Sequence, residues 1–384
     1  MSTLFQNYAR RSVHLVKGQG TIVTDAIGKE YLDFTSGIAV VSLGHANPAI
    51  VEAIRQQSEK LWHVSNLFDS PEQEQLAAGL VKDTPFSHAF FCNSGAEANE
   101  AAIKLARKHT QKNTIITFEQ SFHGRTFGAM SATGQEKVRQ GFGPLLETFK
   151  TIPYNDKQKL EAAIDDDVAA IMLEVIQGEG GVNQIDADFA QFITDVCKEK
   201  GILLIVDEVQ TGISRTGTRY AYEQTNLQPD IMTLAKGLGG GFPIGAMLGS
   251  SVLYESFGPG THGTTFGGNP LAVAVAQTVI DIAFQDEFIQ AVNDKSVYLL
   301  EKLQAVLPKE QFTIRGHGLL LGIECQGGIQ SFIQQAEDAG LLLVQAGADV
   351  IRLLPPLTVT TEEIDQAVAL LSTILVPNAQ PVTN

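Results

Sequence analysis

Two stretches decide the fold, ILLIVDEVQTG at residues 202–212 and TLAKGLGGG at residues 233–241. Each contains a short apolar run typical of a buried strand in an α/β sheet, followed by polar or charged residues. Asp207 and Glu208 follow the first run, and Lys236 follows the second, 29 residues after Asp207. That interval is about one strand–helix–strand unit, so we expect Asp207 and Lys236 to end neighbouring strands at the ligand-facing edge. A solvated turn is the alternative explanation for one of the two acids.

The regions around these stretches predict a large α/β domain followed by a smaller α+β domain. Between about residues 85 and 250, short apolar strands alternate with amphipathic helices, which is typical of a mainly parallel central sheet. We expect an N-terminal segment at 1–47 that joins the small domain, a large domain at 48–287 and a small domain at 288–384. The elements predicted along the chain are a hairpin at 21–34, helices near 48–61, 96–109, 157–164, 187–199, 288–306, 329–339 and 361–375, strands HAFFC (88–92), NTIITF (113–118), AAIMLEVI (169–176), ILLIVDE (202–208), DIMTLA (230–235), LLLVQ (341–345) and DVIRLL (349–354), and a frayed tail at 377–384.

Composition excludes several classes of function. Among 384 residues, 44% are hydrophobic and 18% charged, which is an ordinary globular composition. The net charge of −16 argues against binding nucleic acid or an anionic membrane surface. No apolar run approaches the roughly 18 residues of a membrane helix, and no secretory signal is visible, so we expect a cytoplasmic protein. The three cysteines fit neither a disulfide framework nor a zinc site, and we expect no metal.

Lys236 has surroundings that favour chemistry. Residues 237–268 hold eleven of the 36 glycines, where an even spread would give three, and glycine gathers where backbone approaches a ligand. A partly desolvated lysine loses its proton more readily and attacks carbonyls. In the stretch NSGAEAN (93–99), Ser94 and Glu97 stand at capping-box spacing before a helix. The helix start leaves backbone amides for an anion, although a well-capped helix without a ligand explains the stretch equally well.

The sequence contains neither of two common nucleotide-binding motifs. No GxxxxGK[ST] phosphate loop occurs, and the glycine string at 237–241 fails as a dinucleotide fingerprint because Phe242 replaces its last glycine. An acid, a lysine and a phosphate cradle together match pyridoxal 5′-phosphate. The lysine forms a Schiff base with this cofactor, the acid pairs with its pyridinium nitrogen, and the helix start holds its phosphate.

The motifs then show a resemblance to a known family. The chain resembles the class III (ornithine/acetylornithine-type) aminotransferases over nearly its whole length, with NYAR (7–10) and SNLF (65–68) closest to the acetylornithine subfamily. The blocks that carry the resemblance are NSGAEANEAAIK (93–104), SFHGRT (121–126), LEVIQGEGG (173–181), VDEVQTG (206–212), LAKGLGGGFPIGA (234–246) and HGTTFGGNPLA (262–272). The resemblance implies a fold type I pyridoxal-phosphate transferase.

The resemblance also implies a role for individual residues. Lys236 and Asp207 would be the catalytic lysine and the partner of the ring nitrogen. Phe122 and Val209 would flank the ring, with Gln210 near its hydroxyl. The residues expected around the phosphate are Ser94, Gly95, Ala96 and Thr265, the last from the neighbouring subunit of a homodimer. His123 is expected to have a structural role.

For the substrates, the resemblance assigns two arginines, because guanidinium groups pair with carboxylates. Arg352 would bind the α-carboxylate of 2-oxoglutarate and glutamate, and Arg125 that of acetylornithine. Glu179 would pair with Arg352 when the reacting amine has no adjacent carboxylate. Thr264 is also expected at the substrate. Ile38 occupies the position where ornithine δ-aminotransferases carry a substrate-binding tyrosine, which favours an acylated amine.

The expected activity is therefore transfer of the δ-amino group of N2-acetylornithine to 2-oxoglutarate in arginine biosynthesis. This would give N-acetylglutamate 5-semialdehyde and glutamate. The same chemistry on succinylornithine, ornithine, 4-aminobutyrate or an acylated lysine is the first alternative. A non-catalytic protein on the same fold is the second, because fold alone does not fix function.

Overall fold

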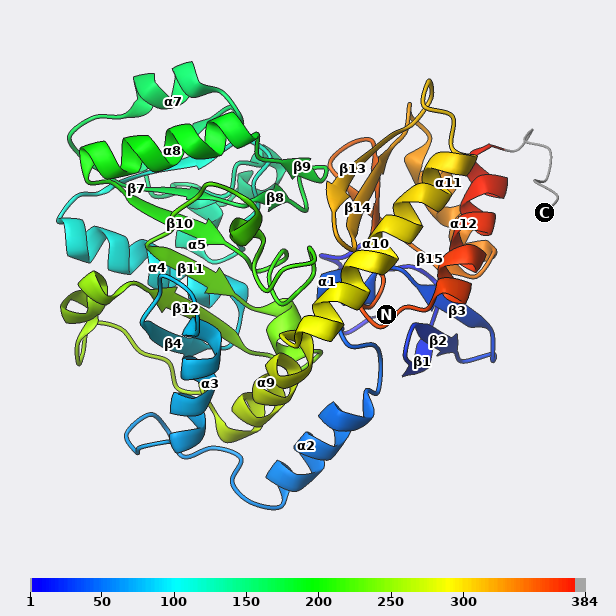
Figure 1. Cartoon of the computed structure of the whole chain (residues 1–384), viewed down its shortest axis with the longest axis horizontal. Helices are drawn as coiled ribbons and strands as arrows, with labels where there is room; N and C mark the ends of the chain where they lie inside the picture. The colour runs from blue at the N-terminus through cyan, green and yellow to red at the C-terminus, as the bar shows by residue number, and fades with distance from the viewer. Residues whose placement is uncertain (1, 377–384) are drawn as a thin grey trace.

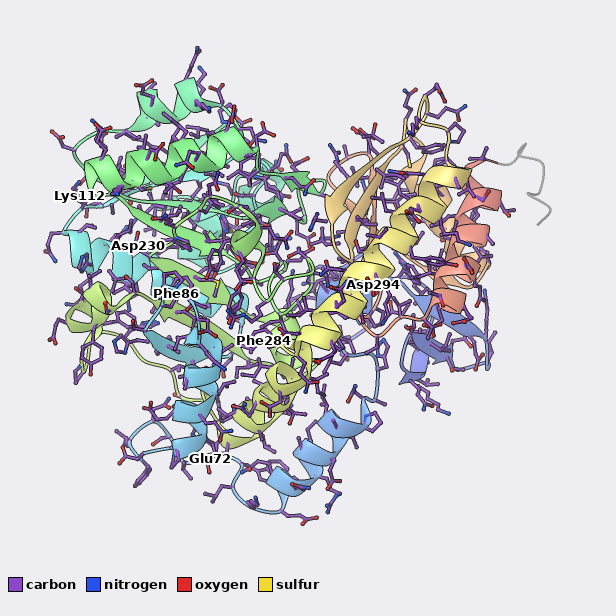
Figure 2. The ribbon with its side chains drawn as sticks, viewed as in Figure 1. Glu72, Phe86, Lys112, Asp230, Phe284 and Asp294 are labelled. Carbon is purple, nitrogen blue, oxygen red and sulfur yellow. The ribbon has the colours of Figure 1, made fainter. Side chains whose placement is uncertain are left out.

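The computed structural model describes residues 2–376, which form two lobes, each with an apolar core (Figure 1). The predicted frayed tail at 377–384 lies outside the described residues. Helix α10 (Asp286–Val306), yellow in Figure 1, runs from the large lobe along the small one. Figure 2 shows Phe284, at the end of α9 (Pro270–Ala283), and Asp294, on α10, where the chain passes between the lobes.

The central sheet of the large lobe confirms the predicted mainly parallel arrangement. Among the described residues it has seven strands, in the order β4-β12-β11-β10-β7-β5-β6. Strand β12 is antiparallel to both neighbours, whereas the pairs among β11, β10, β7, β5 and β6 are parallel. Their bounds are β4 (His88–Cys92), β5 (Thr114–Phe118), β6 (Phe149–Ile152), β7 (Val168–Leu173), β10 (Leu203–Asp207), β11 (Ile231–Leu234) and β12 (Gly245–Gly249).

Helices cover both faces of this sheet because the strand side chains alternate in direction. Leu203 and Ile205 of β10 belong to an apolar cluster with α4 (Gly95–Thr110). Leu204 and Val206 point the other way, into the cluster that contains apolar residues of α3 (Pro71–Val81), α8 (Ala187–Lys200) and α9. Asp207 continues the first alternation and therefore faces α4.

The remaining elements of the large lobe mostly agree with the sequence. The predicted helix at 48–61 is α2 (Pro48–Ser58), with Asn47 as its cap. The single strand predicted at 169–176 is wrong, because β7 ends at Leu173 and the chain bends at Val175. Between them, the Glu174 carboxylate accepts from the amides of Phe122 and Gly178. The other elements are α5 (Phe127–Ala132), α6 (Glu136–Arg139), α7 (Lys157–Ala163), β8 (Ile176–Gln177), β9 (Asn183–Gln184), η1 (Ala221–Gln224), η2 (Lys236–Gly239) and η3 (Ser251–Phe257).

The small lobe joins both ends of the chain. The predicted hairpin is β2 (Ile22–Asp25) and β3 (Glu30–Asp33), and β3 pairs in parallel with β15 (Leu341–Leu342). Its other elements are β1 (Leu15–Gln19), β13 (Thr313–His317), β14 (Leu320–Glu324), β16 (Val344–Ala346), β17 (Val350–Leu353), α11 (Ile329–Asp338) and α12 (Thr361–Leu375). Leu32 and Phe34 share an apolar core with α10 and α12. The domain boundaries at 47 and 287 stay predictions.

A left-handed turn, α1 (Ser36–Ala39), connects the hairpin to the large lobe. All four of its residues have positive φ, between +46° and +66°, and Ile38 is a branched residue at φ +66°. Such a conformation is costly for residues other than glycine and must be held by its surroundings. Asp33 accepts from the amides of Thr35 and Ser36, and the Ser36 hydroxyl donates to the Leu354 carbonyl.

Candidate active site

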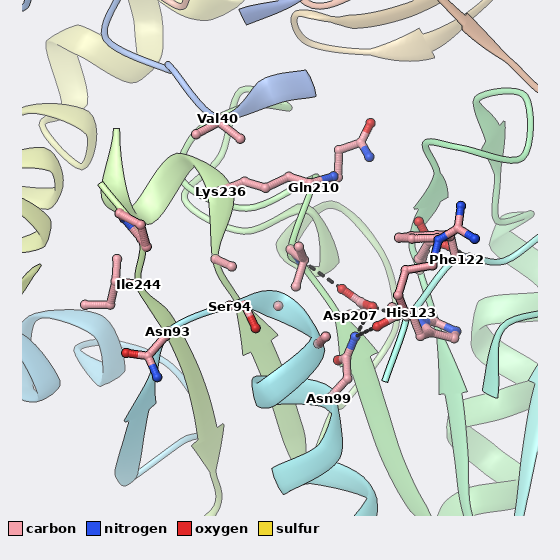
Figure 3. Close-up of a pocket in the computed structure, with 18 of the residues that line it drawn as sticks. Val40, Asn93, Ser94, Asn99, Phe122, His123, Asp207, Gln210, Lys236 and Ile244 are labelled. Atoms are coloured by element: carbon pink, nitrogen blue, oxygen red, sulfur yellow. Dashed lines mark hydrogen bonds and ion pairs between the residues drawn. The ribbon is translucent and has the colours of Figure 1, made fainter. Parts of the chain in front are cut away.

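A cavity of about 400 Å³ lies at the carboxyl end of the parallel strands, within the usual size range of small-molecule sites. It brings together nine predicted site residues: Ser94, Gly95, Ala96, Phe122, Arg125, Asp207, Val209, Gln210 and Lys236. Figure 3 shows Lys236 extending toward Gln210, with Asp207 deeper in the pocket beside the start of α4. The predicted meeting of the lysine and the acid is confirmed, since β10 and β11 are paired neighbours.

Lys236 is placed by a constrained backbone. It follows β11 and begins η2 with φ +40°, a conformation that residues other than glycine rarely adopt. The next residue, Gly237, packs so closely that a Cβ there would lie 2.7 Å from the Ser42 hydroxyl. Burial lowers the pKa of Lys236, and the charge of Arg352 lowers it further, against the opposite effect of nearby carboxylates. The amine is therefore uncharged more often than an exposed lysine.

Asp207 is held by three hydrogen bonds. Its Oδ2 accepts from Asn99 Nδ2 at 2.8 Å and from the His123 ring at 2.7 Å, and its Oδ1 accepts from the Val209 amide at 3.0 Å (Figure 3). Asn99 is itself oriented, because the Thr233 hydroxyl donates to its Oδ1 at 2.7 Å. The carboxylate is thus fixed in position and 3% exposed.

His123 and Glu174 extend this buried network. Burial opposes the charged form of His123, but the hydrogen bond and the charge of Asp207 outweigh it, so its pKa is raised. Burial raises the pKa of Glu174 to about 7, against the effect of His123. The His123 imidazole therefore holds a proton more readily than an ordinary histidine, and its ring nitrogen lies 2.7 Å from Asp207 Oδ2.

The start of α4 provides an anion cradle. The Ser94 hydroxyl accepts from the Glu97 amide at 3.2 Å, as expected for a cap. The other half of the predicted capping box is wrong, because the Glu97 carboxylate accepts from the amide and side chain of Asn93 instead. The first-turn amides of Gly95 and Ala96 have no intrahelical acceptor and point toward the helix start.

Arg352 and Glu179 form an ion pair beside the cavity. Arg352 lies on β17, is 1% exposed, and donates from Nη1 to Glu179 Oε1 at 2.8 Å and to Gln210 Oε1 at 2.7 Å. Burial disfavours the Glu179 carboxylate, but Arg352 outweighs this and lowers its pKa. Gln210 connects the pair to the cavity wall. Arg125 is exposed at the rim, with its guanidinium 5.7 Å from the centre of the Phe122 ring.

The two predicted threonines lie outside the cavity of their own chain. Thr264 reaches only its wall, accepting from Asn93 Nδ2 at 3.1 Å. Thr265 is exposed. Within residues 2–376, no group of His, Cys, Asp and Glu side chains is arranged to hold a metal ion.

Comparison with known proteins identifies the family. Residues 5–375 match the family described as Aminotransferase class-III. The chain belongs to this family. It is therefore a pyridoxal-phosphate-dependent aminotransferase.

Relatives of this aminotransferase are known both as sequences and as solved structures. It is 54% identical to the acetylornithine aminotransferase of Bacillus cereus, over 97% of each chain, and 46% identical to that of Streptococcus mutans, over 97% of this chain and 99% of the relative. Among solved structures, it is similar to ornithine aminotransferase from Toxoplasma gondii (TM-score 0.93, 32% identity, 98% and 93% of the chains). It is also similar to N-acetylornithine aminotransferase from Stenotrophomonas maltophilia (TM-score 0.84, 39% identity, 96% and 97%).

The cavity residues of this aminotransferase fit the cofactor. A Cβ at Gly95 would lie 2.7 Å from the Val209 side chain, so the two surfaces that would face the phosphate and the ring meet with no spare room. Free amides at a helix start suit a phosphate, a carboxyl group fixed by hydrogen bonds suits a ring nitrogen, and a lysine of lowered pKa suits an aldehyde. A second structure of the Toxoplasma gondii enzyme is described with PLP at its active site.

Sequence reasoning missed Asn99 and Glu174 and did not connect His123 with Asp207. One signal for Asn99 was available, because it is a polar residue on the apolar face of α4, beside Ala98 and Ala102. Glu174 and His123 gave no such signal, since the contacts that tie them to the site, Glu174 with Phe122 and His123 with Asp207, join residues 52 and 84 positions apart along the chain.

Proposed function

We propose that this aminotransferase moves the δ-amino group of N2-acetylornithine to 2-oxoglutarate, giving N-acetylglutamate 5-semialdehyde and glutamate. The observation that carries the proposal is the Arg352–Glu179 pair beside Gln210. One half-reaction involves a carbon that bears a carboxylate, and the other a terminal carbon without one. Arg352 can bind the carboxylate in the first half-reaction, and Glu179 can neutralise Arg352 in the second. The name shared by the relatives from Bacillus and Streptococcus supports the choice of amine.

When bound, pyridoxal phosphate withdraws electrons from the substrate carbon and so makes its proton acidic. Lys236 would take that proton on Nζ and return it at the neighbouring atom, because its lowered pKa leaves the amine free to act as a base. Asp207 would hold the ring nitrogen, with Asn99 and His123 keeping the carboxylate oriented. The amides of Gly95 and Ala96, assisted by Ser94, would hold the phosphate.

The substrates would be bound by their carboxylates. Arg352 would take the α-carboxylate of 2-oxoglutarate, displacing Glu179 from Nη1. Arg125, exposed at the rim, would take the α-carboxylate of acetylornithine. With the acetylated donor, Glu179 would stay on Arg352 and neutralise it. Ile38 lies in the strained turn α1 near the rim residue Val40 and leaves no phenol to bind a free α-amine.

We also propose a cytoplasmic homodimer. Thr265 is exposed and outside the cavity of its own chain, which supports a role across a subunit interface. Exposed apolar side chains offer a surface for that interface. Phe266 follows Thr265, and Trp62, Leu67 and Phe68 lie on the segment whose Asn66 donates to the Thr264 carbonyl, with exposures of 62%, 63%, 88% and 68% respectively. None of the helices in residues 2–376 combines the length and apolar character needed to cross a bilayer. Light scattering on the purified holoenzyme measures the assembly, and a monomer would contradict the dimer.

The amine donor is tested by comparing kcat/KM for N-acetylornithine, succinylornithine, ornithine, 4-aminobutyrate and N-acetyllysine with 2-oxoglutarate as acceptor. We expect the acetylated ornithine to be preferred, and a preference for free ornithine would refute the choice. Borohydride reduction followed by peptide mapping should place the pyridoxyl label on Lys236. A protein that stays colourless with added cofactor would support the non-catalytic alternative.

A further inference from the structure

Arg215 is a buried guanidinium between the two lobes, and the proposed reaction gives it no role. It is 2% exposed, and no carboxylate lies within ion-pair distance of it among the described residues. Burial lowers the pKa of Arg215 to about 9. A buried charge without a counter-ion is costly, so its remaining contacts indicate what it is there to hold.

Those contacts tie the large lobe to the strand that carries Arg352. Arg215 Nη1 donates to the Leu319 carbonyl at 3.0 Å and to the Pro355 carbonyl at 2.6 Å. Leu319 immediately precedes β14, and Pro355 follows β17. The two strands pair with Gly322 opposite Arg352. A single guanidinium nitrogen therefore binds beside the start of β14 and beside the end of β17, which are adjacent in this antiparallel pair.

The backbone around Arg215 strengthens this connection. The Leu319 amide donates to the Arg215 carbonyl at 3.0 Å. Gly318 has φ +62°, and a Cβ there would lie 2.4 Å from the Thr216 Cα. The β13–β14 turn and the segment after Arg215 are therefore in backbone-to-backbone contact. The β13–β14 turn cannot shift toward the large lobe without a clash, or away from it without breaking these hydrogen bonds.

Arg215 also belongs to the segment that lines the cavity. Five residues before it, Gln210 accepts from Arg352 Nη1 at 2.7 Å. Arg352 is thus held to this segment twice, directly through Gln210 and indirectly through the strands that Arg215 fixes.

We propose that Arg215 is a positioning residue for Arg352, and so determines how tightly the enzyme binds the carboxylate next to the reacting carbon of 2-oxoglutarate. This inference rests on the role given to Arg352 in the proposed function. It predicts an effect confined to one of the two substrates. The acetylated donor would bind through Arg125 on the large lobe, which does not depend on the position of β17.

The test is Arg215→Met in the holoenzyme, with Arg219→Met as the matched control. Arg219 lies in the same loop but donates to the carbonyls of Lys82 and Asp83, within the large lobe. We expect Arg215→Met to raise the KM for 2-oxoglutarate about tenfold, which corresponds to roughly one lost charged hydrogen bond. The KM for N-acetylornithine and the absorbance of the bound cofactor should change little. Arg215→Lys should restore part of the loss, and Arg219→Met should leave both KM values unchanged.

An unchanged KM for 2-oxoglutarate, or an equal rise in both KM values, would overturn the inference. If Arg215→Met does not fold, Gly318→Ala gives the same test with the arginine in place, because it pushes the β13–β14 turn away from Thr216. The same one-sided rise supports the inference, and unchanged KM values overturn it.

Calorimetric titration with glutarate, a dicarboxylate that cannot react, separates this inference from the proposed function. If the wild-type enzyme fails to transaminate either proposed substrate, the proposed function fails. Weaker glutarate binding in Arg215→Met than in Arg219→Met would still support the positioning role. Equal binding in the two variants, or no binding to the wild type, would overturn it.

Discussion

Replacing Glu179 with glutamine removes the charge that competes with a substrate carboxylate for Arg352. The glutamine amide oxygen can still accept from Arg352 Nη1, which Glu179 does at 2.8 Å, and Gln210 remains as a second acceptor at 2.7 Å. Hydrogen bonds to a charged group such as this guanidinium contribute about 1.5–3 kcal/mol, with a carboxylate acceptor at the upper end of that range and a neutral amide acceptor at the lower end. The competing contact should therefore weaken by about 1.4 kcal/mol, which is roughly tenfold in affinity.

The KM for 2-oxoglutarate should fall about tenfold in Glu179→Gln, because its carboxylate displaces a weaker partner. N-acetylornithine gains nothing, since its reacting carbon carries no carboxylate, and its kcat/KM should stay the same or fall. Initial rates with both substrates varied give the two KM values separately. Glu119→Gln, an exposed acid before the neighbouring turn, is the control. A KM for 2-oxoglutarate that is unchanged or higher would refute the reasoning.

Three further predictions concern Glu208, a buried acid next to Asp207 in the chain, and two residues around the cofactor site. Burial raises the pKa of Glu208 from 4.5 to about 7, so folding retains a proton over this range and stability falls as pH rises through it. Glu208→Gln should therefore gain about 2–3 kcal/mol over the wild type between pH 5 and 8 in urea unfolding, and a gain independent of pH would contradict this. Asn99→Leu removes a donor to Asp207 and should weaken pyridoxal phosphate binding about tenfold or more by absorbance titration, whereas an unchanged Kd would show that Asn99 is dispensable. Gly95→Ala drives a Cβ against Val209 and should also weaken cofactor binding. Adding Val209→Ala should restore the binding, and a double variant that binds as weakly as Gly95→Ala would show that this clash is not the cause.

Local pattern in the sequence was enough to predict five of the seven central strands, namely β4, β5, β7, β10 and β11, and to predict that Asp207 and Lys236 lie at the ends of neighbouring strands. Apolar runs and the interval between them fix which strand ends can meet. The pattern predicted neither β12 nor α9, because the glycines around them hide an apolar strand and a helix that begins at Pro270. Contacts between residues far apart in the chain, such as His123 with Asp207, produce no repeating pattern in the sequence. The strained conformations of Lys236 and Ile38 are likewise set by packing that only the folded chain provides.

The pairing of β3 with β15 has a consequence for how this protein is made. Strand β3 leaves the ribosome early, but its partner at Leu341–Leu342 is translated about 300 residues later, or roughly 15–60 s later at 5–20 residues per second. Until then the hairpin presents an open strand edge, and Leu32 and Phe34 lack the core that α10 and α12 will complete. The small lobe therefore closes only after translation is nearly finished. Slow elongation or a truncated message leaves a chain whose large lobe can fold while its first 35 residues stay exposed to chaperones and proteases.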